Sequence, residues 1–209
     1  MKALLLVDIQ NDFLPGGALP VPDGDQVAPV ANLLMPHFDF VIATQDWHPA
    51  NHASFADNHA QKKPGDRIIL SGLSQILWPR HCVQNTPGAQ LAAGLQLDRI
   101  QKTVQKGTDA AIDSYSGFFD NGHRRRTGLQ DVLAGQGVTN LYVLGLATDY
   151  CVKFTVLDAC ALGYRVFVVV DGCRGVNLAP GDAAAALEEM RRAGAAVVVQ
   201  SGQVAGGGH

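Results

Sequence analysis

The sequence predicts an α/β protein of three layers, in which a mainly parallel, six-stranded sheet lies between two layers of helices. Short apolar runs rich in β-branched residues alternate with segments of helical spacing, which is the pattern of a parallel sheet covered on both faces. The chain of 209 residues is long enough for one well-packed domain. Neither an internal repeat nor a linker divides it, so we expect a single domain over residues 1–209.

The predicted strands are short runs of apolar residues, as buried parallel strands require. The first run is continuous and ends in a carboxylate, and the others end at polar or charged residues as well. In chain order the predicted strands are Ala3–Asp8, Phe40–Thr44, Ile100–Gln105, the run that opens Leu141–Cys151, Val166–Val170, and Ala196–Val199.

Helical spacing predicts four helices, at Val27–Leu34, Thr127–Ala134, Asp149–Leu162 and Asp182–Ala193. The segment Phe13–Asp25 is rich in Pro and Gly and is expected to be loop. Between His48 and Gly94 the periodicity fades, and so long a loop in a compact domain usually serves function. The tail Gly202–His209 is mostly glycine and is expected to be frayed and flexible.

The chain is organised around the stretch Leu141–Cys151, LYVLGLATDYC. Gly145 is expected to end the strand, and Thr148 and Asp149 offer the side chains of a helix N-cap. Cys151 would then lie in the first turn of a helix at the carboxyl end of a strand, where the helix dipole lowers a thiol pKa and favours the thiolate. The alternative is a cysteine that serves as a small buried apolar residue.

Polar residues also follow other strands of the predicted sheet. Asp8 ends the first strand and Lys106 follows the third, and the carboxyl ends of parallel strands lie on one edge. Asp8, Lys106 and Cys151 could therefore converge. A nucleophilic thiol needs a base and benefits from a nearby cation, which an aspartate and a lysine supply. The alternative is that these charges are solvated strand ends.

A carboxylate and several imidazoles form a second candidate group at the same edge. Asp46 and His48 follow the second strand, with His52 four residues later and His81 further on. Such ligands suit Zn²⁺, Fe²⁺ or Mn²⁺, although single histidines are more often surface or core groups. The aromatic residues Phe13, Trp78 and Tyr115 lie in irregular segments nearby, where they could enclose a flat ring or simply anchor loops.

Composition excludes several classes of partner. The formal net charge of −3 gives no general attraction to nucleic acid or anionic membranes. We expect no transmembrane segment, and the apolar N-terminal run lacks the features of a signal peptide. The four cysteines form no C-x-x-C pair, so we expect reduced thiols and a cytoplasmic location.

The motifs as a set resemble the nicotinamidases of the isochorismatase-like cysteine hydrolase superfamily. The resemblance covers most of the chain in order, and the D-W-H and W-P-x-H-C segments separate nicotinamidases from other members. The matching segments are VDIQNDFLPGGAL (7–19), TQDWHPANHASF (44–55), WPRHCVQNTPGAQ (78–90), QKGTD (105–109), DSYSGFFDN (113–121) and GLATDYCVKFT (145–155).

The resemblance implies the isochorismatase-like fold with strand order 3-2-1-4-5-6, and hydrolysis of nicotinamide to nicotinate and ammonia in NAD salvage. Pyrazinamide should also be a substrate. Asp8 would be the general base, Lys106 would stabilise the thiolate, and Cys151 would attack the carboxamide to form a thioester. The backbone N–H groups of Ala147 and Cys151 would form the oxyanion hole, after a cis peptide between Leu146 and Ala147.

The resemblance also implies one divalent metal ion, with Zn²⁺ expected and Fe²⁺ or Mn²⁺ as alternatives. Asp46, His48 and His81 would bind it, while direct ligation by His52 stays open. The walls of the substrate pocket would be formed by Phe13, Trp78 and Tyr115. Whether the protein is a monomer or a homo-oligomer is left undetermined.

Two alternatives to this function differ in chemistry. The first is a related cysteine amidohydrolase that acts on another small amide or carbamoyl compound. The second is a metal-binding or small-molecule-binding protein without turnover. A thiol redox protein is disfavoured because no C-x-x-C motif is present.

Overall fold

The fold was obtained as a computed structural model, which describes residues 1–206. Within these residues a parallel sheet of six strands has the order β5-β2-β1-β6-β7-β8. Numbered along the chain as six strands, this order is 3-2-1-4-5-6, and the predicted fold class is confirmed. The strands are β1 (Lys2–Val7), β2 (Phe40–Asp46), β5 (Lys102–Lys106), β6 (Asn140–Leu146), β7 (Arg165–Arg174) and β8 (Ala196–Val199).

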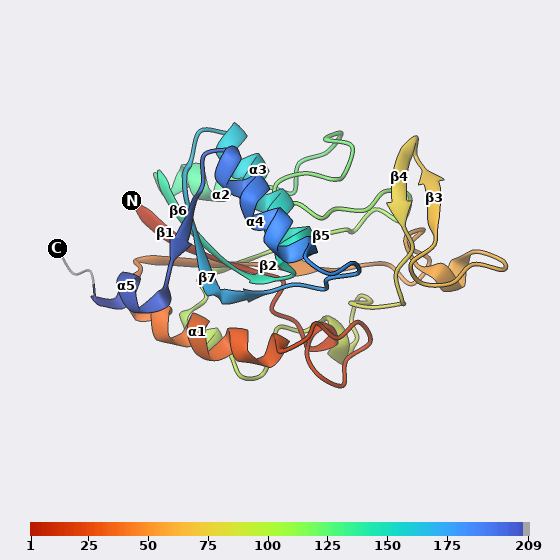
Figure 1. Cartoon of the computed structure of the whole chain (residues 1–209), viewed down its shortest axis with the longest axis horizontal. Coiled ribbons are helices and arrows are strands. Elements are labelled where there is room, and N and C mark those ends of the chain that lie inside the picture. The colour runs from red at the N-terminus through yellow and green to blue at the C-terminus, as the bar shows by residue number, and fades with distance from the viewer. Residues whose placement is uncertain (207–209) are drawn as a thin grey trace.

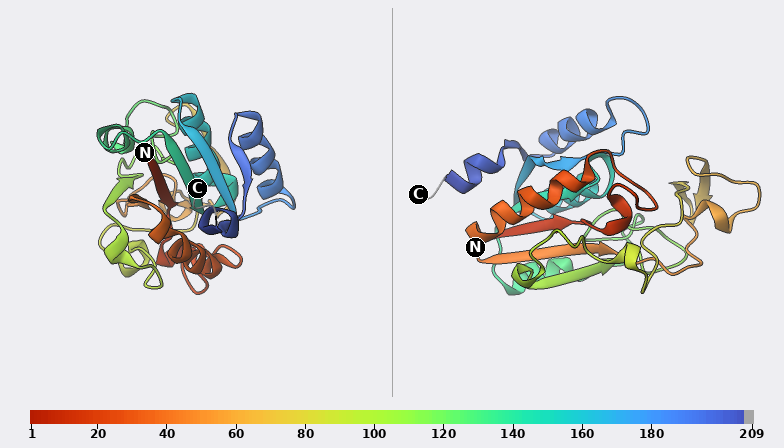
Figure 2. Two further views of the ribbon diagram at one scale, coloured as in Figure 1. Left: turned by 90° about the vertical axis from the view of Figure 1, so that its left-hand side faces the viewer. Right: turned by 90° about the horizontal axis from the view of Figure 1, so that it is seen from below.

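Helices cover both faces of this sheet, as Figures 1 and 2 show. One face carries α1 (Val27–Leu34) and α5 (Ser201–Gly206), and α1 packs against β6 and β7. The other face carries α2 (Leu129–Gly135), α3 (Lys153–Ala161) and α4 (Asp182–Arg192). The three layers arise because the sheet has apolar side chains on both faces and needs cover on each.

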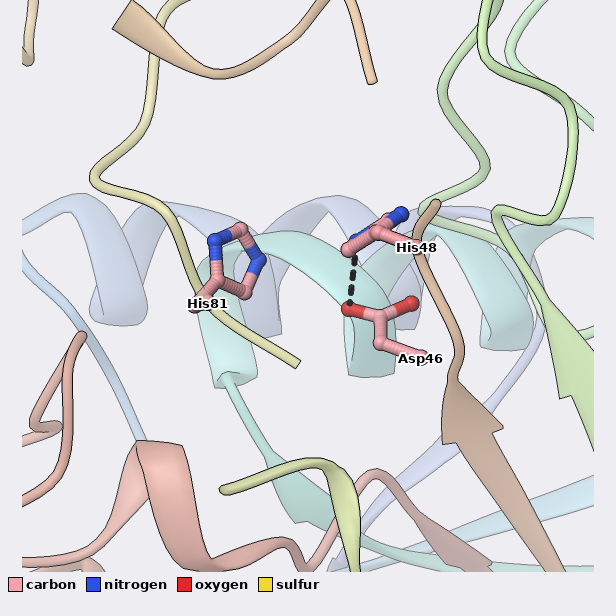
Figure 3. Close-up of side chains that lie close together, drawn as sticks. All are labelled: Asp46, His48 and His81. Atoms are coloured by element: carbon pink, nitrogen blue, oxygen red, sulfur yellow. Dashed lines mark ion pairs between the residues drawn. The ribbon is translucent and has the colours of Figure 1, made fainter. Parts of the chain in front are cut away.

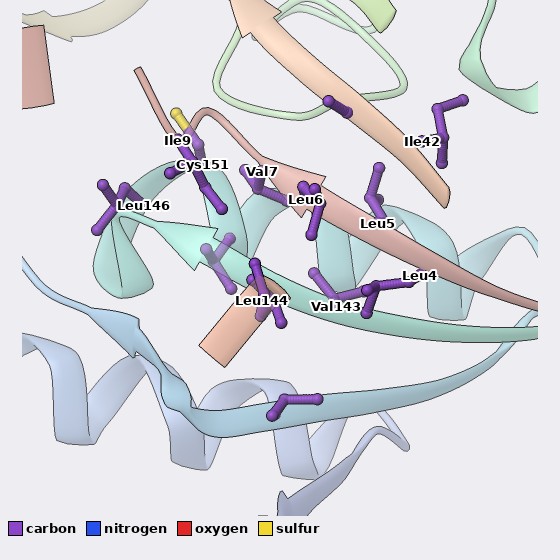
Figure 4. Packing of buried hydrophobic residues seen from close by; sticks show 14 of the residues in the cluster. Leu4, Leu5, Leu6, Val7, Ile9, Ile42, Val143, Leu144, Leu146 and Cys151 are labelled. Atoms are coloured by element: carbon purple, nitrogen blue, oxygen red, sulfur yellow. The ribbon is translucent and has the colours of Figure 1, made fainter. Parts of the chain in front are cut away.

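The core is centred on β1. Residues 3–7 of this strand are completely buried, which explains why its sequence is continuously apolar instead of alternating. Figure 4 shows these side chains packed against those of β6, with Cys151 close to Ile9 and Leu146 at the end of the core. The thiol therefore lies where the apolar core meets the carboxyl edge of the sheet.

Several element boundaries differ from the prediction. Gly145 does not end its strand: it lies inside β6 with φ of +138°, and a Cβ at this position would collide with the Val7 carbonyl of the neighbouring strand. The glycine is required by close approach of two strands. Strand β7 continues past Asp171 with a shift in register, and part of the tail expected to fray forms α5. Residues 207–209 of that tail lie outside the described residues.

The loop predicted after β2 contains a hairpin of β3 (Arg67–Leu70) and β4 (Leu73–Ile76). These strands are only four residues long, too short to reveal their period. In Figure 1 the hairpin and the other irregular segments gather beyond the carboxyl ends of the parallel strands. No helix among residues 1–206 is long and apolar enough to cross a membrane.

Candidate active site and metal centre

The amine of Lys106, at the end of β5, is the hub of a buried polar cluster. Its Nζ lies 2.9 Å from Asp8 Oδ2, 2.5 Å from Asp46 Oδ1 and 3.4 Å from Cys151 Sγ. It also donates a hydrogen bond of 2.8 Å to the Ser114 carbonyl oxygen. The lysine is 1% exposed, so its charge is balanced by these neighbours and not by water. The three residues that follow strand ends thus meet at one edge.

Asp8 stands at the turn after β1, with its backbone in the left-handed region at φ of +48°. Its Oδ1 accepts a hydrogen bond of 2.7 Å from the Thr44 hydroxyl, and its Oδ2 faces Lys106. Burial raises the pKa of Asp8 to about 6, because desolvation outweighs the attraction of Lys106 and the charge of Asp46 adds to it. The carboxylate is therefore ionised at neutral pH and is a stronger base than an exposed aspartate.

The pKa of the Cys151 thiol differs from the prediction. The helix start was predicted to lower the pKa of the thiol, but that pKa lies well above its usual value. Burial is the largest cause of this shift, and although Lys106 favours the thiolate, the charges of Asp8 and Asp46 oppose it. The resting side chain is thus a neutral thiol, and a base must remove its proton at the moment of attack.

The helix start itself also differs from the prediction. A π-helical turn, η7 (Thr148–Val152), precedes α3, and neither Thr148 nor Asp149 caps it through its side chain. The Asp149 carboxylate instead accepts hydrogen bonds from the backbone N–H groups of Val176 (2.9 Å) and Asn177 (2.7 Å). Asp149 therefore connects the turn that carries the thiol to the loop after β7.

Asp46, His48 and His81 point toward one another, as Figure 3 shows. One ligand atom from each lies within 4.8 Å of the others, and all three residues are buried. His48 Nδ1 lies 2.9 Å from the Gly107 carbonyl, and His81 Nδ1 lies 2.7 Å from the Pro79 carbonyl. Because a carbonyl only accepts, each Nδ1 donates its proton to a carbonyl, and Nε2 is the ring nitrogen that faces the donor set. This is the arrangement that histidine ligands of metals adopt, so the donor set fits a divalent cation.

Charge at this donor set is distributed unequally. Burial opposes ionisation of Asp46, but Lys106 and His48 together hold its pKa below the usual range. Burial, together with the charge of the neighbouring His48, lowers the pKa of His81 to about 4. An ionised carboxylate and a neutral imidazole are the forms that bind metals. Asp46 uses one oxygen for Lys106 and turns the other toward His48 Nε2 at 3.6 Å, so it joins the metal donors to the thiol cluster.

His52 does not belong to this first donor set. Its Nδ1 lies 2.7 Å from the Ser54 hydroxyl, and its ligand atom groups with those of His48 and Asp113. The rings of His52 and His48 are 4.4 Å apart between centroids. The structure therefore places His52 beside His48, in a second group of donor atoms with Asp113.

A narrow cavity of about 30 Å³ opens beside the thiol. The three predicted aromatic residues all line it, and the Trp78 indole N–H donates to the Tyr115 hydroxyl at 3.0 Å. Apolar side chains from the loop before α1 and from the loop after β7 complete the wall. The lining residues are Phe13, Leu19, Val21, Asp46, His48, Trp78, His81, Asp113, Tyr115, Ala147, Tyr150, Cys151 and Val176.

The peptide between Leu146 and Ala147 is cis, as the resemblance implies. Ala147 follows the last residue of β6 and lines the cavity together with Cys151. Both residues belong to the short segment that joins β6 to α3, so their backbone groups border the same space as the thiol.

Some residues that shape the site were missed by sequence reasoning. The Gln10 side chain donates to the Asp46 carbonyl and accepts from the Asp46 N–H, both at 2.8 Å, and so fixes the backbone of a metal donor. Thr44 holds Asp8, and Asp113 and Tyr150 line the cavity. All four residues lie in the segments that carry the family resemblance, which is the signal that could have found them.

Comparisons with known proteins identify the family of this chain. The protein-family model described as "Isochorismatase domain" matches residues 2–201 of the chain. The chain belongs to the isochorismatase family. Within this family it is 55% identical over 200 residues to a nicotinamidase of Escherichia coli (strain K12), covering 93% of this chain and 92% of that protein.

Two solved structures of the isochorismatase family are similar over nearly their whole length. A nicotinamidase/pyrazinamidase of Acinetobacter baumanii has a TM-score of 0.93 at 43% identity, with 97% of each chain covered. A pyrazinamidase of Pyrococcus horikoshii, solved in complex with zinc, has a TM-score of 0.76 at 41% identity, covering 95% of this chain and 98% of that one. These matches confirm the family resemblance drawn from the motifs.

Proposed function

We propose that this member of the isochorismatase family is a nicotinamidase, which hydrolyses nicotinamide to nicotinate and ammonia. The observation that carries the proposal is the single buried cluster in which Lys106 contacts Asp8, Asp46 and the thiol of Cys151. Asp46 at the same time faces His48 in the donor set for a metal. The 55% identity to the nicotinamidase of E. coli supports the assignment of the substrate.

In the proposed reaction Asp8 acts as the general base. A carboxylate oxygen of Asp8 lies within 4.8 Å of Cys151 Sγ, and a pKa of about 6 leaves Asp8 ionised at neutral pH. The sulfur attacks the carboxamide carbon as its proton passes to Asp8. The amide C–N bond breaks, the proton goes to the leaving nitrogen, and ammonia departs from a thioester. Water then attacks the thioester, giving nicotinate and the restored thiol.

Two groups would stabilise charge during these steps. The Lys106 ammonium, 3.4 Å from Sγ, offsets the negative charge that develops on sulfur. The backbone N–H groups of Ala147 and Cys151 would form the oxyanion hole for the tetrahedral intermediates. Both border the cavity, so a carbonyl placed over the thiol could reach them.

Asp46, His48 and His81 would hold the divalent cation, for which we propose Zn²⁺, with Fe²⁺ or Mn²⁺ as alternatives. When bound, the metal supplies a Lewis acid that can accept the ring nitrogen of the substrate. The chain itself orients the two imidazoles through backbone carbonyls and keeps the site buried. Phe13, Trp78 and Tyr115 belong to other parts of the wall, where they would enclose a single flat ring. Pyrazinamide, with a ring of the same size, should also be hydrolysed.

The test is ammonia release from nicotinamide by the wild type and by Cys151→Ala. We expect the variant to lose all turnover while its metal content is unchanged, because Cys151 is not in the metal donor set. Cys160→Ala, in α3 and partly exposed, is the matched control and should retain activity. A wild type that releases no ammonia from nicotinamide would refute the proposal.

The same assay distinguishes the two alternative functions from a nicotinamidase. Turnover of nicotinamide that survives complete removal of the metal by a chelator would favour a related amidohydrolase with another substrate. Metal binding without turnover of any pyridine carboxamide would favour a binding protein.

We also propose that residues 1–209 act as one domain, since the residues of the site gather at the carboxyl edge of a single sheet. A cytoplasmic location suits an enzyme whose nucleophile must stay a reduced thiol. There the reaction would supply nicotinate for NAD salvage.

A further inference from the structure

A second and larger cavity lies behind the wall of the proposed substrate pocket. It has a volume of about 350 Å³, whereas the inner pocket beside the thiol has about 30 Å³. The outer cavity lies between the β3–β4 hairpin and the helical segments η7, α3 and α4. Its lining includes Arg67, Ile76, Lys153, Phe154, Ala185 and Glu189.

The two cavities share the side chains of Tyr115 and Tyr150. These rings pack edge to face, with centroids 5.4 Å apart and planes at 65°. Tyr150 also packs edge to face on Trp78, at 4.8 Å and 88°. The aromatic rings therefore form a partition between the pocket that holds the thiol and the outer cavity.

The two tyrosines of the partition are held differently. The Tyr115 hydroxyl accepts hydrogen bonds from Trp78 Nε1 at 3.0 Å and from Gln75 Nε2 at 2.9 Å. Removing Tyr115 would leave two donors without their acceptor. Tyr150 contributes its ring through packing on Trp78 and Tyr115. Of the two, Tyr150 is the ring whose removal opens the partition and leaves this hydrogen-bonded network in place.

We propose that Tyr150 is a specificity-determining residue, which limits substrates to small single rings by separating the inner pocket from the outer cavity. This inference rests on the proposed function, because it concerns which amides reach Cys151. It assigns to Tyr150 a steric role: the phenol ring fills the space through which a substituent on the pyridine ring would extend.

The lining of the outer cavity indicates which substituent fits. Phe154 is 37% exposed, stacks on Tyr115 at 5.4 Å with planes at 27°, and presents an aromatic surface. The charged side chains of the lining have both signs, since Arg67 and Lys153 stand with Asp149, Asp182 and Glu189. Lys153 is paired with Glu189 at 3.4 Å, so no uniform charge is left for a charged substituent to match. A flat, uncharged group the size of a phenyl ring therefore suits this space better than a charged one.

The experiment compares nicotinamide with nicotinamides that carry a phenyl group at ring position 5 or 6, on the metal-loaded enzyme. The measured quantity is the ratio of kcat/KM for the phenyl compound to kcat/KM for nicotinamide. We expect Tyr150→Ala to raise this ratio by about tenfold or more for at least one of the two compounds, the size of effect that one apolar group has in a pocket. Tyr150→Phe keeps the ring and should leave the ratio unchanged.

A double variant tests whether the outer cavity accepts the substituent. Ala185, on α4, lines that cavity, and Ala185→Trp would place an indole ring in the space where the phenyl substituent would lie. We expect Ala185→Trp to reverse the gain of Tyr150→Ala. Persistence of the gain in the double variant would mean general loosening of the site, and would overturn the proposal.

The proposal is also overturned if the ratio in folded Tyr150→Ala equals that of the wild type, or if Tyr150→Phe changes it as much. If Tyr150→Ala fails to fold, Tyr150→Leu keeps an apolar side chain but removes the ring, and its ratio decides in the same way. Turnover of unsubstituted nicotinamide by the wild type is measured alongside. Its absence would refute the proposed function, whereas its presence with an unchanged ratio refutes only the role of Tyr150.

Discussion

Replacement of Lys106 by methionine should destabilise the fold as well as stop turnover. The lysine is the cation between two buried carboxylates, at 2.9 Å from Asp8 and 2.5 Å from Asp46. Methionine fills a similar volume but leaves both acids without this partner. Breaking a buried ion pair by removal of one member costs about 3–5 kcal/mol. Since domains are stable by only about 5–15 kcal/mol, the loss is a large fraction of the total.

The assay is thermal unfolding followed by circular dichroism, with Lys102→Met as the matched control. Lys102 begins the same strand and is exposed, so its replacement should change stability little. For a chain of this length about 1 kcal/mol shifts Tm by about 2–4 °C, so we expect Lys106→Met to melt about 6–20 °C lower. Equal melting temperatures for the two variants would refute the view that Lys106 compensates the buried acids.

The destabilisation of Lys106→Met should also depend on pH with a definite sign. In the wild type the pKa of Asp8 is already raised from 3.8 to about 6, and loss of the lysine removes an influence that lowers it. A carboxyl group whose pKa is higher in the folded state than in the unfolded state does not destabilise the fold at a pH below its unfolded pKa, because the group is then protonated in both states. Its cost grows as the pH rises from about 4 through the folded pKa. The gap between the two variants should therefore be smaller at pH 5 than at pH 8.

Three further outcomes are expected. The kcat/KM for nicotinamide should fall about tenfold per pH unit below the pKa of Asp8, which is about 6. A bound metal offsets nearby negative charge and should move the midpoint of this fall to lower pH. A profile that stays flat down to pH 4 would exclude Asp8 as the base. His81→Ala should lose both its zinc, measured by elemental analysis, and its activity, whereas replacement of exposed His37 by alanine should keep both. Full metal content in His81→Ala would show that His81 is not a metal ligand. Asp149→Ala leaves two backbone N–H groups without their acceptor and should lower the free energy of unfolding, measured with denaturant, by about 2–4 kcal/mol. Replacement of exposed Asp98 by alanine should change it little, and equal stability of the two variants would show that the Asp149 hydrogen bonds are dispensable.

Local chemistry in the sequence was enough to predict the sheet and the edge at which the site lies. Continuous apolar runs such as Ala3–Asp8 identify strands buried on both faces, and their polar ends identify the residues that parallel strands bring together. The motifs around Asp46, His81 and Cys151 pointed to the family. These inferences succeed because strand period, strand direction and ligand chemistry are properties of short segments.

Tertiary structure decided how those residues interact. The sequence treated the metal donors and the thiol cluster as separate groups, but Asp46 contacts Lys106 with one oxygen and faces His48 with the other. The pKa of Cys151 is raised and not lowered, because burial and the charges of two carboxylates outweigh the attraction of Lys106. Asp149 was expected to cap a helix and instead binds a loop 27 residues further along.

The sequence by itself therefore determined which chemical groups are available and on which edge of the sheet they stand. Only the folded structure decided their distances, their burial and the division between the two cavities at Tyr150. The physical reason is that desolvation and Coulomb interactions depend on separations in space of a few ångströms, between segments up to a hundred residues or more apart in the chain.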